Sequence, residues 1–356
     1  MPKIKQLDFA GQTIFCGIDV HKKNWRVNIR NDQFELEDYT QDPCEDLFMK
    51  HLHKKYPGAR YQVAYEAGFS GFGLQRSLTT SDIPCIVVNP ADIPSTDRDK
   101  KRKTDQIDAR KISRHLSKST LRPIHVPGVE MEHARTLVRQ RGRLVKDQTR
   151  CKNRVLHLLM FSGLKLSMDK PNDHWSRRFV ESIRMLPCQT EYLRQALDTA
   201  LEEYLLIRNL VSVTTKQIRA LSQQKTLIKT QKLIQGIPGI GLLNSMTIIT
   251  ELQDMKRFKT LDKLCSYAGI VPDTGSSGES NIIKGITHRS NHHLRTAIVE
   301  SSWVIIRKDP AMLHLYKKYC TVMVPNKAII KIARHLLSRI RYVWTNQIEY
   351  EIGLVG

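Results

Sequence analysis

The sequence lacks several features that would assign it to common classes of protein. No apolar stretch is long enough to span a membrane, and no hydrophobic segment of the signal-peptide kind follows the first residues. Seven cysteines occur, an odd number, and no two of them have the Cys-x-x-Cys spacing. These absences argue against a membrane protein, a zinc site and a disulfide framework. We therefore expect a cytoplasmic, nucleoid-associated protein with reduced thiols.

Acidic residues are also scarce. The chain of 356 residues has 35 Asp and Glu against 57 Lys and Arg, which gives a formal net charge of +22. Such an excess favours a polyanionic partner, and the rival explanation is attraction to a membrane surface. The length is sufficient for two or three domains.

Four of these scarce acids occur in a suggestive pattern. Asp105 and Asp108 are three residues apart, so a helix would place both on one face. Asp19 follows the apolar run 14–18 and Glu66 follows the run 61–65, where a carboxylate is costly unless it is paired or bound to metal. A basic run precedes Asp105 and consists of Arg98, Lys100, Lys101, Arg102 and Lys103. Taken singly, each acid is better explained as a capping or solvated carboxylate, and for the basic run the alternative is a solvated loop or a localisation-like tag. Together they predict a divalent-metal site that acts on a phosphodiester.

Residues 14 to about 125 alternate strand-like and helix-like segments. The runs 15–18 and 25–29 flank a short turn and predict a hairpin. Further strands are predicted at 61–65 and 86–88, and helices at 45–53 and 71–79. The pattern indicates an α/β domain with a mixed sheet.

A long helix is predicted from about 132 to 160 by an apolar stripe with helical spacing. This stripe consists of Leu137, Leu144, Gln148, Cys151, Val155 and Leu158. The opposite face carries Arg139, Arg143, Lys146, Arg150 and Arg154. Between residues 139 and 154 the only acid is Asp147, whereas an ordinary solvated face mixes both signs. We interpret the basic face as a contact for the nucleic-acid backbone, with a solvated face as the alternative.

A second long helix is predicted by apolar residues that step by fours and threes. They are Leu193, Leu197, Ala200, Tyr204, Ile207, Val211, Ile218 and Leu221, with a gap at Thr214 that keeps the phase. Such a seam is typical of a coiled coil. Its partner is either the helix at 132–160 in the same chain or a helix of another subunit.

Two glycine-containing segments follow. The run 233–242 contains Gly239-Ile240-Gly241 and matches a helix-hairpin-helix, in which backbone N–H groups at a helix start approach a phosphate. The alternative is a tight turn between helices that binds no ligand. The segment Pro272 to Ser280 is small and polar, and its composition alone predicts a surface loop.

The sequence resembles the DEDD-type insertion-sequence transposases, which are related to the Piv/MooV DNA invertases. The resemblance covers nearly the whole chain. In the first half it rests on Gly17-Ile18-Asp19-Val20-His21-Lys22, Tyr65-Glu66-Ala67-Gly68, Val88-Asn89-Pro90 and Lys103-Thr104-Asp105-Gln106-Ile107-Asp108-Ala109. In the second half it rests on Ile237-Pro238-Gly239-Ile240-Gly241, Ala268-Gly269-Ile270-Val271-Pro272, Ser276-Ser277-Gly278 and Asn291-His292-His293-Leu294-Arg295.

The resemblance implies an α/β, ribonuclease-H-like (RuvC-like) domain over residues 12–126. A helical, coiled-coil region over 127–230 and a mainly α transposase domain over 231–356, with the helix-hairpin-helix and a serine loop, would follow. Asp19, Glu66, Asp105 and Asp108 would hold Mg²⁺, with Mn²⁺ as a substitute. Ser277 would be the catalytic nucleophile that forms a phosphoserine link to DNA, with Ser276 as the runner-up.

The resemblance also implies partners. These are the element ends and target DNA, a structured guide RNA that pairs with both, and further copies of the chain in a dimer or tetramer formed through the coiled-coil helices. Besides the basic residues above, the expected nucleic-acid contacts are Gly239, Gly241, Lys284, Arg289 and Arg295. Two rival functions remain: a metal-dependent junction nuclease that uses water, and a non-catalytic nucleic-acid-binding protein.

Overall fold

The computed structural model describes residues 9–94, 105–165, 175–277, 280–287 and 289–353, with the side chains of 105–106 and 273–284 left out. The chain divides into two compact units, Met1–Val126 and Pro127–Gly356, each of which is described by itself. None of the helices within these ranges combines the length and the apolar character needed to span a bilayer.

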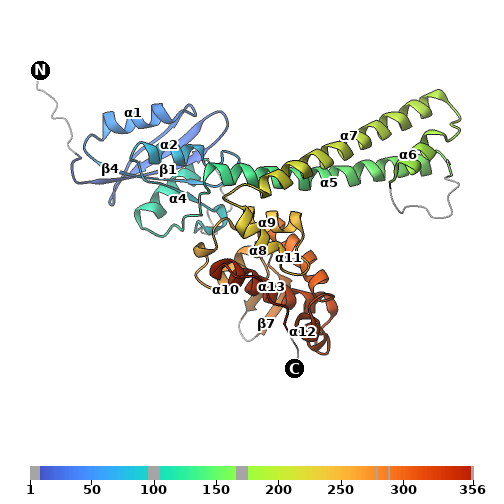
Figure 1. The fold of residues 1–356 in the computed structure, drawn as a ribbon. Coiled ribbons are helices and arrows are strands. Elements are labelled where there is room, and N and C mark those ends of the chain that lie inside the picture. The colour runs from blue at the N-terminus through green and yellow to red at the C-terminus, as the bar shows by residue number, and fades with distance from the viewer. Residues whose placement is uncertain (1–8, 95–104, 166–174, 278–279, 288, 354–356) are drawn as a thin grey trace, which may run out of the picture. The chain divides into compact units, whose positions relative to one another are not determined.

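A five-stranded mixed sheet forms the centre of the first unit (Figure 1). Its strands are β1 (Thr13–Val20), β2 (Trp25–Arg30), β3 (Glu35–Gln41), β4 (Arg60–Glu66) and β5 (Cys85–Val88), in the order β3-β2-β1-β4-β5. Strands β1, β4 and β5 are parallel, and β2 and β3 run antiparallel to their neighbours. The predicted hairpin, the other two strands and the mixed sheet are confirmed.

Strand β3 was not expected from the sequence. It reads Glu-Leu-Glu-Asp-Tyr-Thr-Gln and lies at the sheet edge, where its acids find cationic partners instead of a core. Glu37 accepts hydrogen bonds from His51 (2.8 Å) and Lys55 (2.7 Å), and Asp38 pairs with Arg26 at 2.6 Å. Charged residues of this kind also protect an edge strand against unwanted pairing.

Helices cover both faces of this sheet. They are α1 (Glu45–Lys55), α2 (Gly73–Thr80) and α4 (Asp105–Ser117), with a short 3₁₀ turn at Pro90–Asp92. Residues such as Ile14 and Ile18 of β1 pack with α1 and α2 on one face, whereas Phe15 packs with Ile112 and Leu116 of α4 on the other. Alternate residues of β1 therefore face opposite layers, as the period of a strand requires.

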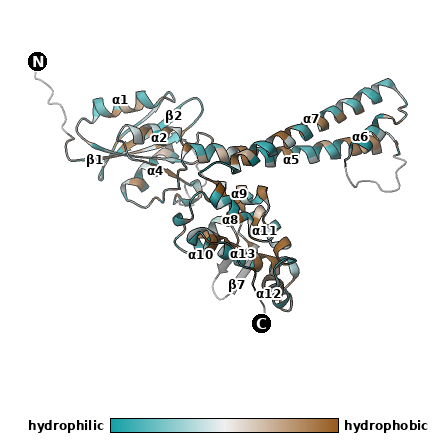
Figure 2. Cartoon of the chain, viewed as in Figure 1, coloured by the Kyte–Doolittle hydropathy of each residue, from teal (hydrophilic) through white to brown (hydrophobic). Residues whose placement is uncertain are grey.

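The second unit begins with two long helices that pack along each other (Figure 1). They are α5 (Val129–Phe161) and α7 (Glu191–Ser222), joined through α6 (Arg177–Arg184). Residues of the predicted seam, including Leu197 and Tyr204, are buried against α5, so the partner of the seam is in the same chain. Thr214, the gap in the seam, is buried too, and its hydroxyl donates to the carbonyl of Leu210 at 2.8 Å. Figure 2 shows hydrophobic residues in separate patches along these two helices, with hydrophilic residues between them.

The rest of the second unit is mainly helical. Its helices are α8 (Ile228–Gln235), α9 (Leu242–Leu252), the 3₁₀ turn η2 (Met255–Arg257), α10 (Leu261–Ala268), α11 (His292–Ile305), α12 (Pro310–Cys320) and α13 (Pro325–Asn346). Between α10 and α11 the strands β6 (Pro272–Ser277) and β7 (Ser280–Ile286) form an antiparallel pair. A large hydrophobic core joins these helices to Val138 of α5 and Ile218 of α7.

Candidate functional site: carboxylates at a sheet edge and a serine hairpin

Two of the predicted acids lie at the carboxyl ends of neighbouring parallel strands. Residue Ile18 of β1 is in register with Tyr65 of β4, so the next residue of each strand, Asp19 and Glu66, lies at the same sheet edge. Phe15 and Ala64 face the layer that contains α4. Counting by twos places Asp19 and Glu66 on that same face.

Helix α4, in which the other two acids occur, packs on this face of the sheet. Gly17 makes the close approach possible, because a Cβ at this position would lie 2.3 Å from the carbonyl oxygen of Ala109 and 2.4 Å from the backbone nitrogen of Ser113. Asp108 directly precedes Ala109, and Asp105 is the first residue of the helix. The helix expected around these two residues is therefore present, although the side chain of Asp105 lies outside the described residues.

The described acids have basic partners that the sequence reading missed. The ring Nε2 of His21 lies 3.0 Å from Oδ2 of Asp19, and Nζ of Lys111 lies 3.5 Å from Oδ1 of Asp108. Both aspartates are mostly buried, with side chains 16% and 17% exposed. The available signal was the spacing in the sequence: His21 is two residues after Asp19, and Lys111 is three residues after Asp108, so each pair is close along the chain.

The donor chemistry of this edge fits a hard divalent cation. Asp19, Glu66 and Asp108 all supply carboxylate oxygens, the ligands that Mg²⁺ and Mn²⁺ prefer. Within the described side chains, no group of three or more His, Cys, Asp or Glu is close enough to hold a metal ion. Asp105 is not among the side chains compared, so the four-acid set stays a prediction.

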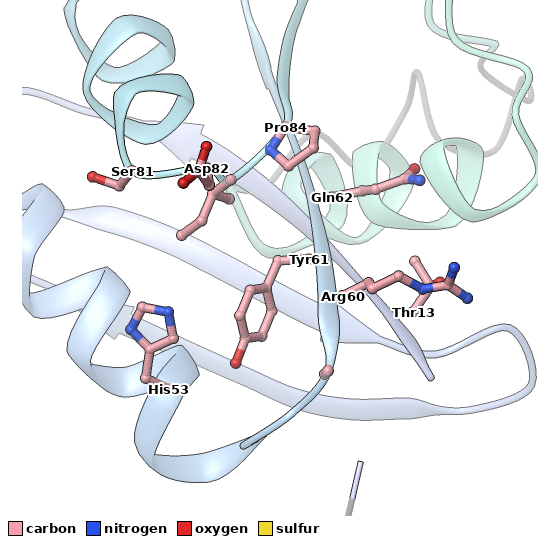
Figure 3. A pocket seen from close by; sticks show the side chains of 10 residues that line it. Thr13, His53, Arg60, Tyr61, Gln62, Ser81, Asp82 and Pro84 are labelled. Carbon is pink, nitrogen blue, oxygen red and sulfur yellow. The ribbon is translucent and has the colours of Figure 1, made fainter. Parts of the chain in front are cut away.

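A pocket of about 520 Å³ lies at the other end of the same strands (Figure 3). Thr13 begins β1, and Arg60 and Tyr61 begin β4; His53 of α1 and Asp82 complete this wall. Six residues of β1 separate Thr13 from Asp19, which corresponds to roughly 20 Å along a strand. The pocket is therefore separate from the carboxylate edge.

The segment that carries Ser276 and Ser277 is a strand pair, so the expected surface loop was wrong. Ser276 is paired with Asn281 and Ser277 with Ser280. The backbone pairing of β6 with β7 extends to Ser277, the serine of the Ser-Gly motif. The composition did not indicate a strand, because the segment is rich in small and polar residues. The side chains of both serines lie outside the described residues.

Both ends of this hairpin are fixed to helices. The N–H of Thr287 donates to the carbonyl of Val271 at 3.1 Å, which closes the base of the hairpin. Arg295 of α11 donates to the Thr287 carbonyl at 3.0 Å and to the hydroxyl of Ser290. Gly269 ends α10 with φ +72°, and a Cβ there would collide with Ser290. Arg295 thus holds the hairpin base, and its expected role as a nucleic-acid contact stays a prediction.

A buried carboxylate lies beneath this base. Glu251 of α9 is 1% exposed and accepts two hydrogen bonds from Arg139, at 2.6 and 2.7 Å. Asn291 donates to the same carboxylate at 2.8 Å, and its own Oδ1 caps α11 by accepting from the N–H of Leu294. Burial alone raises the pKa of Glu251, but the hydrogen bonds from Arg139 and Asn291 outweigh it and hold that pKa below its ordinary value. The network ties α5, α9 and α11 together.

Arg139 therefore has a structural role that the sequence did not indicate, and its expected contact with nucleic acid stays a prediction. Arg154 is also paired, with Glu203 of α7, and Arg150 pairs with Asp147 at 2.7 Å. Arg143 donates to Oε1 of Gln140 at 2.8 Å. The sequence could not reveal these pairs, because Glu251 and Glu203 lie far along the chain from α5.

The remaining expected nucleic-acid contacts fall into two groups. The basic run Arg98, Lys100, Lys101, Arg102 and Lys103, and the side chain of Lys284, lie outside the described residues. Arg289 is exposed, and its N–H donates to the hydroxyl of Thr287 at 3.2 Å.

The turn of the expected helix-hairpin-helix contains two glycines that differ in their surroundings. Helices α8 and α9 flank the turn as expected. Gly239 has φ +91°, and a Cβ there would lie 2.7 Å from the carbonyl of Ser301 and 2.9 Å from the nitrogen of Ile305. This glycine is therefore required for packing against α11, and its expected contact with a phosphate stays a prediction. A Cβ on Gly241, the N-cap of α9, would meet no atom within 4 Å.

Two family models match this chain. A model described as "Transposase", for the DEDD transposases of IS110, matches residues 16–162. A second, described as "Transposase IS116/IS110/IS902 family", matches residues 231–317. The first covers the carboxylate edge with α4, and the second covers the buried Glu251 network and the serine hairpin.

Curated relatives agree with these models. The chain is 29% identical over 297 residues to the putative transposase y4qE of Sinorhizobium fredii, covering 81% of this chain and 71% of that protein. It is 25% identical over 213 residues to the transposase for insertion sequence element IS1111A of Coxiella burnetii, with 58% and 56% covered. For the transposase for insertion sequence element IS1533 of Leptospira borgpetersenii, the identity is 24% over 248 residues, with 68% and 70% covered.

Proposed function

We propose, from the premise that this chain belongs to the IS116/IS110/IS902 family of transposases, that it cleaves and exchanges DNA strands with a serine nucleophile and a carboxylate-bound divalent metal. The family makes the chain an enzyme of DNA transposition encoded by a mobile element, which implies DNA binding. Its DEDD half implies the use of a divalent metal. The serine, the identity of the metal, the guide RNA and the oligomer are the parts that we propose.

The observation that carries the metal proposal is the arrangement of β1, β4 and α4. Asp19 and Glu66 lie at the carboxyl ends of adjacent parallel strands, and Gly17 permits the close packing of α4, whose first turn contains Asp105 and Asp108. The strand order β3-β2-β1-β4-β5, in which β2 alone runs opposite to the other four strands, supports a ribonuclease-H-like fold. Bound there, Mg²⁺, or Mn²⁺ in its place, would offset the negative charge of a scissile phosphodiester. The carboxylates would hold the cation, and His21 would hold Asp19 in place.

The serine step conserves the phosphodiester. The hydroxyl oxygen of Ser277 forms a bond to phosphorus, the bond from phosphorus to one deoxyribose oxygen breaks, and that oxygen leaves with a proton. The resulting phosphoserine is then attacked by the hydroxyl of a second strand, which restores the serine. A serine hydroxyl is a weak nucleophile and requires activation by a base or a metal. The Ser-Gly match to the family supports Ser277, and Ser276 is the runner-up.

The acids are tested by a conservative change and a matched control. Asp108→Asn should abolish strand exchange and leave nucleic-acid binding unchanged, because an amide is a weaker ligand than a carboxylate for a hard cation. Asp105→Asn should behave in the same way. Asp82→Asn makes the same chemical change at an exposed residue of the same unit with φ 57°, a conformation that Asn adopts readily, and should keep activity. Full activity of Asp108→Asn and Asp105→Asn in Mg²⁺ would remove the metal assignment.

The serine is tested by trapping the covalent intermediate. Wild-type protein incubated with a nicked suicide DNA should give an adduct that survives a denaturing gel and maps to Ser277. Ser277→Ala should bind DNA normally and give no adduct, whereas Ser276→Ala should retain it. An adduct on Ser276 would identify the neighbour as the nucleophile. Strand cleavage at the wild-type rate by the double alanine variant, without adduct, would favour the junction nuclease that uses water. If loss of the acids leaves all measurable function intact, the non-catalytic binding protein is favoured.

We also propose a structured guide RNA, which the family resemblance and the net charge of +22 support. When the protein is produced together with its own flanking non-coding segment, the purified protein should retain an RNA transcribed from that segment. It should also protect this RNA from ribonuclease. Target choice should then change when the pairing segments of the RNA are replaced. Transposition that is unaffected by such replacement would exclude guidance.

An oligomer is supported by apolar side chains that α5 leaves uncovered. Leu206, Leu210 and Val213 of α7 are 60%, 39% and 41% exposed, and their spacing of four and three places them on one face. We expect a second copy of the chain to cover this face. Leu210→Glu should convert the oligomer to a monomer in light scattering coupled to size exclusion, whereas Glu202→Gln, on the same helix, should not. An unchanged mass for Leu210→Glu would refute this interface.

A further inference from the structure

A pocket of about 340 Å³ opens in the second unit between α5, α9 and α11. The α5 wall is basic and contains Arg141, Arg143 and Lys146. Arg139 also contributes, but its charge is offset by the buried Glu251. A volume of this size is at the lower end of the range for small-molecule pockets, and it is far too small for a duplex.

The basic wall retains hydrogen-bonding capacity. Arg141 uses Nε to bond the hydroxyl of Thr215 at 2.8 Å, and Arg143 uses Nε to bond Gln140. Within the part of the chain that the structure describes, Lys146 has no hydrogen-bond or ion-pair partner, and it is exposed at the pocket. A guanidinium has further N–H donors beyond Nε, so these groups are suited to a phosphate.

The opposite wall is the first part of α11, a helix of 14 residues. His292, His293, Thr296 and the exposed Glu300 line the pocket there, and the two histidines lie at the positive end of the helix dipole. Burial lowers the pKa of His293, and the nearby charge of Arg139 lowers it further, against the opposing effect of Glu251. A neutral imidazole can stack on a base and can donate or accept one hydrogen bond.

The floor differs in character from the walls. Val138, Ile218, Leu243 and Ala297 are apolar, and the amide of Asn244 and the hydroxyl of Thr247 lie among them. The Nδ2 of Asn244 donates to the hydroxyl of Ser301 at 3.0 Å, which fixes the orientation of the amide. A pocket with a cationic rim, an apolar floor and a few fixed polar groups matches a nucleotide, which has an anionic end and a flat face with polar edges.

We propose that this pocket binds one unpaired nucleotide of a nucleic-acid strand, with its phosphate on Arg143 and Lys146 and its base between His293 and the apolar floor. The inference rests on the proposed function only in requiring a nucleic-acid partner. Recognition of a single extruded nucleotide would let the protein distinguish a bulge, a strand end or a junction from continuous duplex.

The test compares oligonucleotides that contain 2-aminopurine in an unpaired or a paired position, titrated with full-length protein without divalent metal. With wild-type protein we expect tighter binding and a larger fluorescence change for the unpaired position. Lys146→Gln should weaken binding of the unpaired oligonucleotide by about tenfold, because one charge-assisted contact is lost, and should affect duplex by less than about twofold. Lys317→Gln is the matched control, since Lys317 of α12 (Pro310–Cys320) is an exposed lysine of the same unit that lies outside the pocket lining.

A second variant tests the cavity itself. Thr296→Tyr places a ring at the exposed rim of the pocket and should abolish the preference for the unpaired oligonucleotide while duplex binding persists. DNA and RNA versions of each oligonucleotide show which strand supplies the nucleotide. Equal losses for Lys146→Gln and Lys317→Gln on both substrates, or an unchanged 2-aminopurine signal in Lys146→Gln, would refute the pocket and leave only general backbone attraction. Because no metal or serine chemistry is measured, failure of this binding test is distinct from failure of the adduct experiment.

Discussion

The sharpest test of the structural argument is removal of Arg139, which the sequence alone suggested as a nucleic-acid contact. In the structure its guanidinium holds the carboxylate of Glu251, which is 1% exposed, through two hydrogen bonds. Arg139→Met keeps much of the volume and removes the charge. We expect this change to destabilise the second unit and to loosen the base of the serine hairpin, because Asn291 shares the same carboxylate.

The magnitude follows from the burial of the partner. Removal of one member of a buried ion pair costs about 3–5 kcal/mol, since the other charge is left without compensation. Arg139 itself is 36% exposed, and the hydrogen bond from Asn291 at 2.8 Å remains. The loss should therefore lie near the lower limit, about 3 kcal/mol. Arg150→Met removes an exposed pair and should cost no more than about 0.5 kcal/mol.

The two forms should also differ in their dependence on pH. In the wild type the pKa of Glu251 is below its ordinary value of 4.5, so its contribution is present above that pH and is lost as the pH falls below it. Without Arg139, burial dominates and raises this pKa. The variant should then gain stability as the pH falls from 7 towards 5, because protonation removes the unpaired charge. The difference between the two proteins should shrink with acidification.

The assay is urea unfolding of the full-length protein at pH 7 and at pH 5, followed by tryptophan fluorescence, with hydrogen exchange of peptides from α9 and α11 as the local measurement. Faster exchange in both helices, together with the larger cost at pH 7, is expected for Arg139→Met. If Arg139→Met and Arg150→Met are equally stable at pH 7, the Glu251 network does not support this unit. A loss in Arg139→Met that is the same at both pH values would show that packing, and not charge, is responsible.

Three further predictions concern close packing and burial. Gly239→Ala should lower the free energy of unfolding by about 1–3 kcal/mol, because its φ is +91° and its Cβ would lie 2.7 Å from a backbone oxygen. Gly241→Ala is the control. Its Cβ would have open space around it, so its free energy of unfolding in the same urea titration should be within about 0.5 kcal/mol of wild type. Gly17→Ala should displace α4 from the sheet, because its Cβ would lie 2.3 Å from a backbone oxygen. We therefore expect this variant to lose strand exchange and to retain nucleic-acid binding. Wild-type activity would contradict the packing of α4 on β1. Burial raises the pKa of the Cys85 thiol to about 12. At pH 8 this thiol should therefore react with iodoacetamide more than about tenfold slower than the partly exposed Cys188, as measured by peptide mass spectrometry. Equal rates would show that the sheet opens.

Local patterns in the sequence were sufficient for most elements. The long helices α5 and α7 have apolar stripes at helical spacing. The strands at 15–18, 61–65 and 86–88 are short, mainly apolar runs, and the strand at 25–29 alternates apolar and polar residues. These signals are local because a stripe or a run needs only neighbouring residues. Strand β3 and the pair β6–β7 were missed for the same reason: one is stabilised by charged partners on other elements, and the other consists of small polar residues.

The sequence by itself determined which residues are candidates for chemistry: the four acids, the two serines and the cationic face of α5. Only the tertiary structure decided what several of them do. Glu251 is 112 residues from Arg139, and Ser301 is 62 residues from Gly239, so no local pattern could show that the arginine is paired or that the glycine is packed against a helix. The register of β1 and β4 brought Asp19 and Glu66 to one edge, and the contact at Gly17 placed α4 beside them. The spacing of apolar residues specifies which face of a helix or strand is buried. Which residues contact that face is fixed only when segments that are distant in the sequence pack together.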